Sequence, residues 1–402
     1  MTATTPRLLR RTISALGLGL FIALGAVMVL YDDLPNDFFY YTASVRTLHA
    51  GGSAYLPFQI GPSFLYHPAI LTVMTWLAAL DDQTAYLVWL GLSFLAYGLT
   101  LAVLLRFANK HLLADGRRLG VLEQVILAGA FLAFRPTLQT FIQGQINLFV
   151  LLALALALLW SEDGREAWAG IALGLAVAAK VSPVVLLAYF LVTRAWRVIL
   201  WSAVTVIVLS ALAWLQFGSG VFADFITASL FVMGGIHEWR SNHSLPMWLL
   251  TFFRNLSLED AAYTLASWLP RLLYWGVSGL AVLVGLLRAD RLRESALARY
   301  WLYALLVAQM TLASPLVWNH HLVFLVLPLV FLLARQETRA IGLGLTALFQ
   351  LEPVLGWLLG AAWIPGTALV AAQVLLFLAL AWLFWRAVRA APAALTATAD
   401  AH

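Results

Sequence analysis

The sequence predicts an all-α, polytopic membrane protein. The 402-residue chain is 63% hydrophobic and only 11% charged, and no long polar block interrupts its apolar runs. A soluble domain cannot bury so large an apolar share, so most side chains are expected to face lipid or one another. We therefore expect a single membrane domain over residues 1–390, in the inner membrane of a cell, and a disordered cytoplasmic tail over 391–402.

Twelve apolar runs are candidate membrane-spanning helices. Several are shorter than the roughly 20 residues that a spanning helix needs, so flanking residues or a locally thinner bilayer must complete them. The first run follows a basic segment, as in a signal peptide, but no convincing cleavage site follows, and we expect an uncleaved span. The runs cover residues 14–31, 84–105, 121–134, 141–160, 167–180, 182–193, 198–215, 272–288, 300–313, 321–334, 340–350 and 365–385.

The apolar run 68–80 is expected to form an outer-face or re-entrant helix instead of a span. With both termini in the cytoplasm, 18 of the 24 basic residues then lie on the inner side, as the positive-inside rule requires. Counting 68–80 as a span would invert everything after it. The residues expected inside are Arg7, Arg10, Arg11, Arg106, Lys110, Arg117, Arg118, Arg165, Arg194, Arg197, Arg288, Arg291, Arg293, Arg299, Arg335, Arg339, Arg386 and Arg389.

The segment 167–193 is either one long helix or two shorter ones. Lys180 interrupts its apolar run and Pro183 follows closely. Because the residue before a proline disfavours helix, the sequence favours a break here.

With this topology the unusual polar segments gather on the outer face, in the loops 32–83 and 216–271 and at the outer ends of spans. The inner connections are short, basic and otherwise plain. A transporter is expected to carry polar groups through both halves of the bilayer. The pattern therefore favours an active site that opens outward, with a transporter or a lipid flippase as the alternative.

Asp37 is the candidate catalytic acid in the segment YDDLPNDFFYY, residues 31–41. On a helix over 37–49 it shares one face with Tyr40, Tyr41 and Ser44, while Phe38 or Val45 is expected in the membrane interface. A carboxylate in a partly desolvated cleft suits a general base, because burial raises its pKa toward the working pH. The alternative is that Asn36 or Asp37 only caps the helix. Asp32 and Asp33 are expected to be solvated.

Arg135 and Lys180 are cations that lie outside against the charge bias. One interpretation is that they extend to lipid headgroups, which basic residues at helix ends commonly do. The other is a phosphate-binding pair, since Arg offers a bidentate fork and Lys a point charge to a lipid-linked phosphate. The proline near each residue favours the phosphate-binding role.

Three further polar segments are candidate sugar contacts. The segment QGQIN contains Gln143, Gln145 and Asn147 at the outer end of a span. Amides near lipid need hydrogen-bond partners, which sugar hydroxyls can supply. The alternative is that these residues cap the helix. The segment NHHLVF contains two adjacent histidines, which either bind a metal together or contribute one histidine to the site. Adjacent histidines on a helix point in different directions, which favours the single histidine. RSNHSL contains Asn242 and His243, either in the site or in an ordinary surface loop.

Composition also excludes several chemistries. The chain has no cysteine, so disulfides, thiol catalysis and cysteine-bound metals are ruled out. It has no glycine-rich phosphate loop and no zinc-ligand spacing, so we expect no metal and no cofactor. The net charge of +5 follows from membrane topology and does not indicate a nucleic-acid partner.

The ordered set NDFFYYTASVRTLHAGGSAY, LYHPAI, RPTLQTFIQGQINLFV, AGIALGLAVAAKVSPVVLL, NHSL and SPLVWNHHLVF resembles glycosyltransferase family 87 over about residues 32–335. That resemblance implies a GT-C-type transmembrane bundle that uses polyprenyl-phosphate mannose as its donor at the non-cytoplasmic face. It implies a catalytic base at Asp37 and a site histidine at His320. Here Asn319 replaces the usual acid, which weakens a metal role, and YHP replaces the commoner YPP.

The resemblance further implies an inverting transfer to a glycan or glycolipid acceptor. Arg135 and Lys180 would bind the donor phosphate. Pentose transfer and oligosaccharide polymerisation share this layout, and a non-catalytic assembly partner is a further alternative. The expected sugar and acceptor contacts are Tyr41, Tyr66, His67, Gln143, Gln145, Asn147, Asn242, His243 and Asn319.

Overall fold

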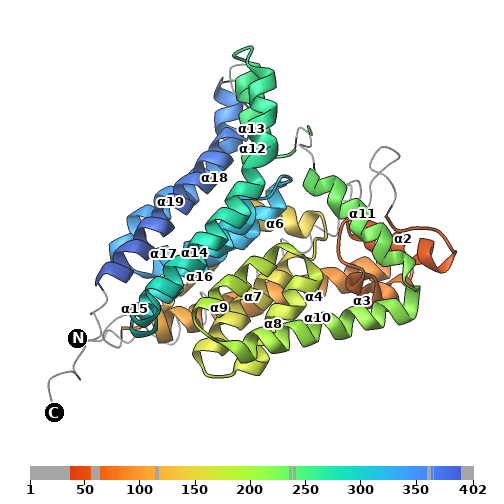
Figure 1. The fold of residues 1–402 in the computed structure, drawn as a ribbon, viewed down its shortest axis with the longest axis horizontal. Coiled ribbons are helices and arrows are strands. Elements are labelled where there is room, and N and C mark those ends of the chain that lie inside the picture. Colours follow the sequence, from red (N-terminus) through yellow and green to blue (C-terminus); the bar gives the residue numbers. More distant parts are fainter. Residues whose placement is uncertain are drawn as a thin grey trace.

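The structure, a computed structural model, describes residues 37–55, 64–113, 117–234, 238, 241–359, 364 and 366–390. Within these residues all regular structure is helical, which confirms the predicted fold class (Figure 1). The predicted first span, Asp32, Asp33 and the predicted tail lie outside the described residues. The helices are α2 (Phe38–His49), α3 (Ala69–Ala78), α4 (Asp82–Phe107), η1 (Ala108–Leu112), α5 (Val121–Leu132), α6 (Arg135–Ile142), α7 (Asn147–Glu162), α8 (Glu166–Ala179), η2 (Ser182–Leu186), α9 (Leu187–Val192), α10 (Trp196–Phe217), α11 (Gly220–Gly234), α12 (Leu245–Arg254), α13 (Glu259–Arg271), η3 (Leu272–Gly276), α14 (Val277–Leu287), α15 (Ala289–Glu294), α16 (Ala296–Leu312), η4 (Asn319–Leu325), α17 (Val326–Ala334), α18 (Gln336–Leu359) and α19 (Thr367–Ala390).

The described residues contain five helices that are long and apolar enough to cross a membrane. A sixth span results if α5 and α6, which meet at a 54° bend, are counted as one. The protein is therefore membrane-embedded, but the predicted number of twelve spans is not confirmed. The five helical stretches are Asp82–Leu112, Trp196–Phe217, Tyr263–Leu287, Gln336–Leu359 and Thr367–Ala390.

The other predicted spans exist as shorter helices, and several of these lie in the centre of the protein. Almost every residue of α16 and all of α17 are buried, as is most of α7. Helix α7 has 16 residues, so it is about 24 Å long, less than the ~30 Å hydrocarbon core. These central helices end early because polar segments, such as the one before Asn147, interrupt them.

The predicted break at Lys180 is confirmed. Helix α8 ends at Ala179, and Lys180 has an extended backbone (φ −151°, ψ 122°). The chain then continues as η2, which has Pro183 in its first turn, and as α9.

Helix α2 packs against α3 at one end of the bundle (Figure 1). The Arg46 guanidinium fixes α2 there, because it donates to the carbonyls of Ala78 and Leu80 and pairs with Asp82 at 2.7 Å. Helix α3 has 10 residues, about 15 Å, which is too short to span a bilayer. This confirms that 68–80 forms a short helix of its own.

The buried face of α2 differs from the predicted one. Phe38, Tyr41 and Val45 are buried, while Tyr40 is 39% exposed. The spacing of the buried residues is the i, i+3, i+7 stripe of a helix that packs on protein. The prediction that Phe38 or Val45 lies in the membrane interface is therefore wrong, and Tyr40 lies at the exposed edge of the predicted face.

Candidate active site

A tight turn between α6 and α7 forms the base of the candidate site. Gly144 has a left-handed backbone (φ 62°), which glycine adopts without strain, so the chain can reverse within QGQIN. Two contacts hold the turn in place. Phe38 N donates to the Gln143 carbonyl at 3.2 Å, and Trp89 Nε1 donates to the Gly144 carbonyl at 2.7 Å. Helices α2 and α4 thereby fix the position of Gln145.

Gln145 connects three of the predicted site residues. Its side chain is 1% exposed, and its Nε2 donates to Asp37 Oδ2. Its Oε1 accepts hydrogen bonds from Tyr41 Oη at 3.1 Å and from Tyr66 Oη at 2.5 Å. The two tyrosine hydroxyls keep the amide oxygen on their side, so the amide nitrogen faces the carboxylate.

The Asp37 side chain makes no capping hydrogen bond to α2. The capping alternative therefore does not describe how this carboxylate is used. Partial burial raises the pKa of Asp37 to about 6, although the hydrogen bond from Gln145 and the charge of Lys180 act in the opposite direction. A carboxylate with a pKa near 6 is mostly ionised at neutral pH and still basic enough to accept a proton.

Lys180 lies next to this group. Its ammonium is 3.4 Å from Asn147 Oδ1, and it lies 5.7 Å from the ring centres of both Tyr66 and Phe324. No carboxylate within the described residues forms a salt bridge with it. The ammonium is thus held by an amide and two aromatic faces. Burial lowers the pKa of Lys180 to about 7, although the charge of Asp37 acts in the opposite direction.

Both the backbone carbonyl and the ring of His320 belong to the candidate site. Its carbonyl accepts hydrogen bonds from Thr140 Oγ1 and Asn147 Nδ2, both at 3.1 Å. Its side chain is 5% exposed, and within the described residues His320 Nε2 and Asn319 Oδ1 are buried atoms without a hydrogen-bond partner. Leaving such an atom unpaired costs about 1–3 kcal/mol, so a bound substrate is a natural partner for it.

A small cavity of about 20 Å³ adjoins the Lys180 ammonium. It has the volume of roughly one water molecule. His321 lines it, whereas His320 does not. The lining residues are Lys180, Ser182, Met310, Thr311, Ser314, Val317, His321 and Phe324.

The model of glycosyltransferase family 87 matches residues 64–315, which is 252 of the 402 residues in the chain. The chain belongs to glycosyltransferase family 87. It is therefore a membrane glycosyltransferase that acts on a sugar donor and an acceptor, which confirms the family and the reaction class expected from the sequence. A search of curated proteins finds no match. The matched region contains Tyr66, Gln145 and Lys180 but neither Asp37 nor His320.

Several predicted site residues of this glycosyltransferase lie outside the Asp37 network. Arg135 begins α6, and its backbone N–H donates to Gln350 Oε1 at 3.0 Å, which ties this end of α6 to α18. His67 accepts a hydrogen bond from Ala69 N at 3.2 Å and packs its ring against α11. The Gln143 side chain is half-buried, and the network uses only its carbonyl.

Asn242 and His243 hold the loop before η4. Asn242 donates to the Pro315 carbonyl and accepts from Val317 N at 3.0 Å, and His243 N donates to the Val317 carbonyl. These bonds position the segment that leads to His320, so the described contacts of Asn242 are structural.

Sequence reasoning missed Trp89, Thr140 and Phe324 as supports of the site. Trp89 looks like one more aromatic residue of a span, and nothing local indicates that its indole reaches the 143–147 turn. Thr140 offered a signal, because it lies within the motif RPTLQT and a threonine beside a polar turn often makes a hydrogen bond.

Proposed function

We propose that this glycosyltransferase moves mannose from a polyprenyl-phosphate donor to a hydroxyl group of a glycan or glycolipid at the non-cytoplasmic face. The observation that carries the proposal is the Asp37 carboxylate, which is partly buried, fixed by Gln145 and joined through Tyr66 to the Lys180 ammonium. A base and a cation in one network are what transfer from a lipid phosphate requires.

In the proposed step the acceptor hydroxyl attacks the anomeric carbon of the donor while Asp37 accepts its proton. A carbon–oxygen bond forms to the acceptor as the bond between the anomeric carbon and the phosphate oxygen breaks. The electron pair of that bond leaves with the polyprenyl phosphate, and the configuration at the anomeric carbon inverts. The products are the glycosylated acceptor and the lipid phosphate.

Lys180 is proposed to bind the donor phosphate. Its positive charge stabilises the additional negative charge that the phosphate acquires as it leaves. We give Arg135, which begins α6, a secondary role at the donor phosphate. Tyr41, Tyr66, Asn147 and the unpartnered atoms of Asn319 and His320 are the proposed contacts of the sugar and the acceptor.

The course of α7 supports an enzyme over a transporter. Between Asn147 at one end and Ser161 near the other, the helix carries only apolar residues, with one tryptophan. A polar path for a substrate would need polar groups near the midplane. Helix α7 offers none on its own surface, which supports an enzyme with its site at one end of the bundle.

The decisive experiment compares Asp37→Asn with the wild-type enzyme in liposomes that contain polyprenyl-phosphate mannose, glucose or arabinose. Loss of a general base costs on the order of 10²- to 10⁴-fold in rate, and an amide of the same size cannot accept the proton. We expect transfer of mannose by the wild type, and a loss in that range for Asp37→Asn with unchanged donor binding.

Matched controls come from the same loop. Asp32→Asn and Asp33→Asn remove the same charge and should stay within about a few-fold of the wild-type rate, as for solvated acids. Normal turnover by Asp37→Asn would reject this base, and a preference for another lipid-linked sugar would reject mannose.

A further inference from the structure

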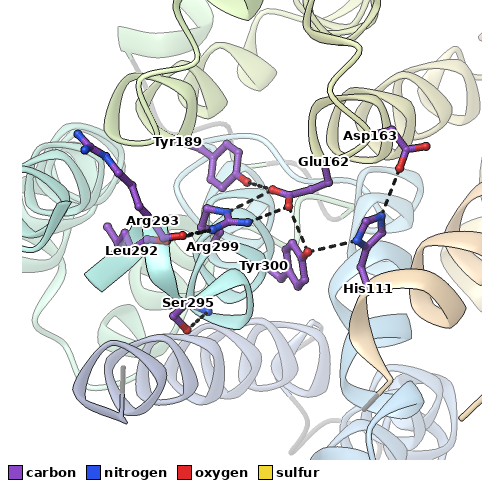
Figure 2. Close-up of polar contacts among 10 residues, drawn as sticks. His111, Glu162, Asp163, Tyr189, Leu292, Arg293, Ser295, Arg299 and Tyr300 are labelled. Atoms are coloured by element: carbon purple, nitrogen blue, oxygen red, sulfur yellow. Dashed lines mark hydrogen bonds and ion pairs between the residues drawn. The ribbon is translucent and has the colours of Figure 1, made fainter. Parts of the chain in front are cut away.

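A second polar cluster lies at the opposite end of α7 from Asn147. The Glu162 carboxylate accepts hydrogen bonds from Arg299, at 2.9 Å and 3.3 Å, and from the hydroxyls of Tyr189 and Tyr300 (Figure 2). Asp163 beside it pairs with Lys110 at 2.5 Å. On the predicted topology this cluster lies on the inner side, where the sequence predicts short, basic and otherwise plain connections.

Glu162 and Arg299 neutralise each other. Arg299 uses Nε and Nη2 on the carboxylate, and its Nη1 donates to the carbonyls of Leu292 and Arg293 at 3.3 Å and 2.8 Å. All three guanidinium nitrogens are thus occupied within the protein. The pair ties α7 to α16 and, through the two carbonyls, to α15, and it leaves no net charge.

A pocket of about 340 Å³ opens beside this pair. Its volume lies at the small end of the range for small-molecule sites, about 300–1,000 Å³. Of its other charged residues, Arg194, Arg293 and Glu166 have no salt bridge within the described residues. Two cations and one acid give the pocket one surplus positive charge. It is lined by Ser161, Glu162, Gly164, Glu166, Tyr189, Thr193, Arg194, Ala195, Leu292, Arg293 and Arg299.

The two arginines differ from Arg299 in how they are placed. In Figure 2 the Arg293 side chain extends away from the Glu162 cluster, and no contact of its guanidinium is drawn. Arg194 has a left-handed backbone (φ 57°), a conformation that glycine or asparagine usually occupies. Arg194 therefore lines the pocket at a position whose positive φ angle favours glycine.

Two exposed tryptophans lie close to the pocket in the sequence. Trp196, which follows the pocket residue Ala195, is 57% exposed, and Trp168 near the start of α8 is 59% exposed. Exposed tryptophans are enriched where the bilayer meets water. Basic pockets between membrane helices at that depth bind anionic lipid headgroups.

We propose that this pocket binds the phosphate group of an anionic glycerol headgroup, such as that of phosphatidylglycerol. Arg194 and Arg293 contact the phosphodiester oxygens, whose single negative charge matches the surplus of the pocket. Glu166 accepts a hydrogen bond from a headgroup hydroxyl. The same phosphate chemistry also occurs in soluble glycerol phosphate, so the lipid and the soluble ion need separate tests.

Native mass spectrometry of the delipidated full-length protein with equimolar phosphatidylglycerol and phosphatidylcholine tests the proposal. We expect the wild type to prefer phosphatidylglycerol, and Arg194→Gly and Arg293→Gln each to reduce this binding about tenfold. Arg194→Gly removes the charge while relaxing the backbone, so it should remain folded. Glu166→Gln should bind the anionic lipid more tightly, because it removes the opposing charge and keeps an amide oxygen that accepts the hydrogen bond of the headgroup hydroxyl.

Arg197→Gln is the matched control, since Arg197 is exposed three residues after Arg194 but does not line the pocket. It should bind the lipid as the wild type does. A parallel titration with glycerol phosphate shows whether the soluble ion competes, which would assign the same pocket to a soluble phosphate. An equal loss in Arg197→Gln, or no dependence on Arg194 and Arg293 with either ligand, would overturn the proposal.

Discussion

The Gln145 side-chain amide donates a hydrogen bond to the Asp37 carboxylate, although 108 positions separate the two residues in the sequence. Tyr41 and Tyr66 hold the oxygen of that amide, so Gln145 presents an N–H group to the carboxylate and stabilises its ionised form. Burial and this hydrogen bond act on Asp37 in opposite directions, and their balance sets the pH at which the proposed base works.

The rate of transfer should therefore depend on pH through Asp37. Its pKa of about 6 means that the carboxylate is protonated and inactive at lower pH, so kcat/KM should rise through pH 6. Burial lowers the pKa of Lys180 to about 7, so kcat/KM should fall again above pH 7 as the ammonium loses its proton. Removing the Gln145 hydrogen bond raises the pKa of Asp37 further. In Gln145→Leu we expect the lower midpoint of the profile to move to higher pH, beyond the wild-type value.

Gln143→Leu is the control for this profile, because Gln143 contributes only its backbone carbonyl to the network. Its midpoint should match the wild type. Equal midpoints for Gln145→Leu and the wild type would show that another group limits the rate.

Lys180 and Arg135 should differ in their effect on donor use. Lys180 contacts the Asp37 network, whereas the described hydrogen bond of Arg135 is made by its backbone, to Gln350 of α18. If Lys180 stabilises the departing phosphate, Lys180→Gln should lower kcat/KM by roughly 10²-fold, the usual cost of losing one such group. Arg135→Gln should have the smaller effect. Wild-type turnover of Lys180→Gln at limiting donor would leave Lys180 as a lipid-headgroup anchor.

Much of the candidate site was predictable, because its residues stand in short polar segments that interrupt apolar runs. Asp37, Gln145, Asn147 and Lys180 each stood out in this way, and the structure joins them through hydrogen bonds and one cation–aromatic contact. Their roles in the reaction stay predictions. The helix break after Ala179 was also predictable, because the effect of Pro183 on the backbone is local.

Features that depend on distant packing were not predictable. Four consecutive aromatic residues begin α2, so the pattern could not show that Phe38 and Tyr41 are buried and Tyr40 is exposed. Glu162 and Arg299 are 137 positions apart, and the sequence around each is typical of an ordinary charged loop, so their contact could not be predicted. The lengths of the central helices likewise follow from where their polar ends meet in the fold.

The Glu162–Arg299 pair should matter for stability. The two side chains are only 11% and 20% exposed. Removing one partner of a buried pair leaves the other charge uncompensated and costs on the order of 3–5 kcal/mol. Glu162→Leu should therefore lower the unfolding free energy in that range, seen as a lower melting temperature in detergent. Lys110→Gln, which removes an exposed partner of Asp163, should cost about 1 kcal/mol or less.

The last prediction concerns the orientation of the bundle in the membrane. The 18-to-6 division of basic residues puts the Glu162 end in the cytoplasm and the Asp37 end outside. The chain has no cysteine, so single cysteines are clean probes. Ser219→Cys, exposed between α10 and α11, should react with a membrane-impermeant maleimide on intact cells, and Glu294→Cys, exposed at the end of α15, only after permeabilisation. Ser53 is a poorer probe position because its hydroxyl is bound to Asp224. Labelling of Glu294→Cys on intact cells would invert the topology and move the Asp37 network to the cytoplasmic side.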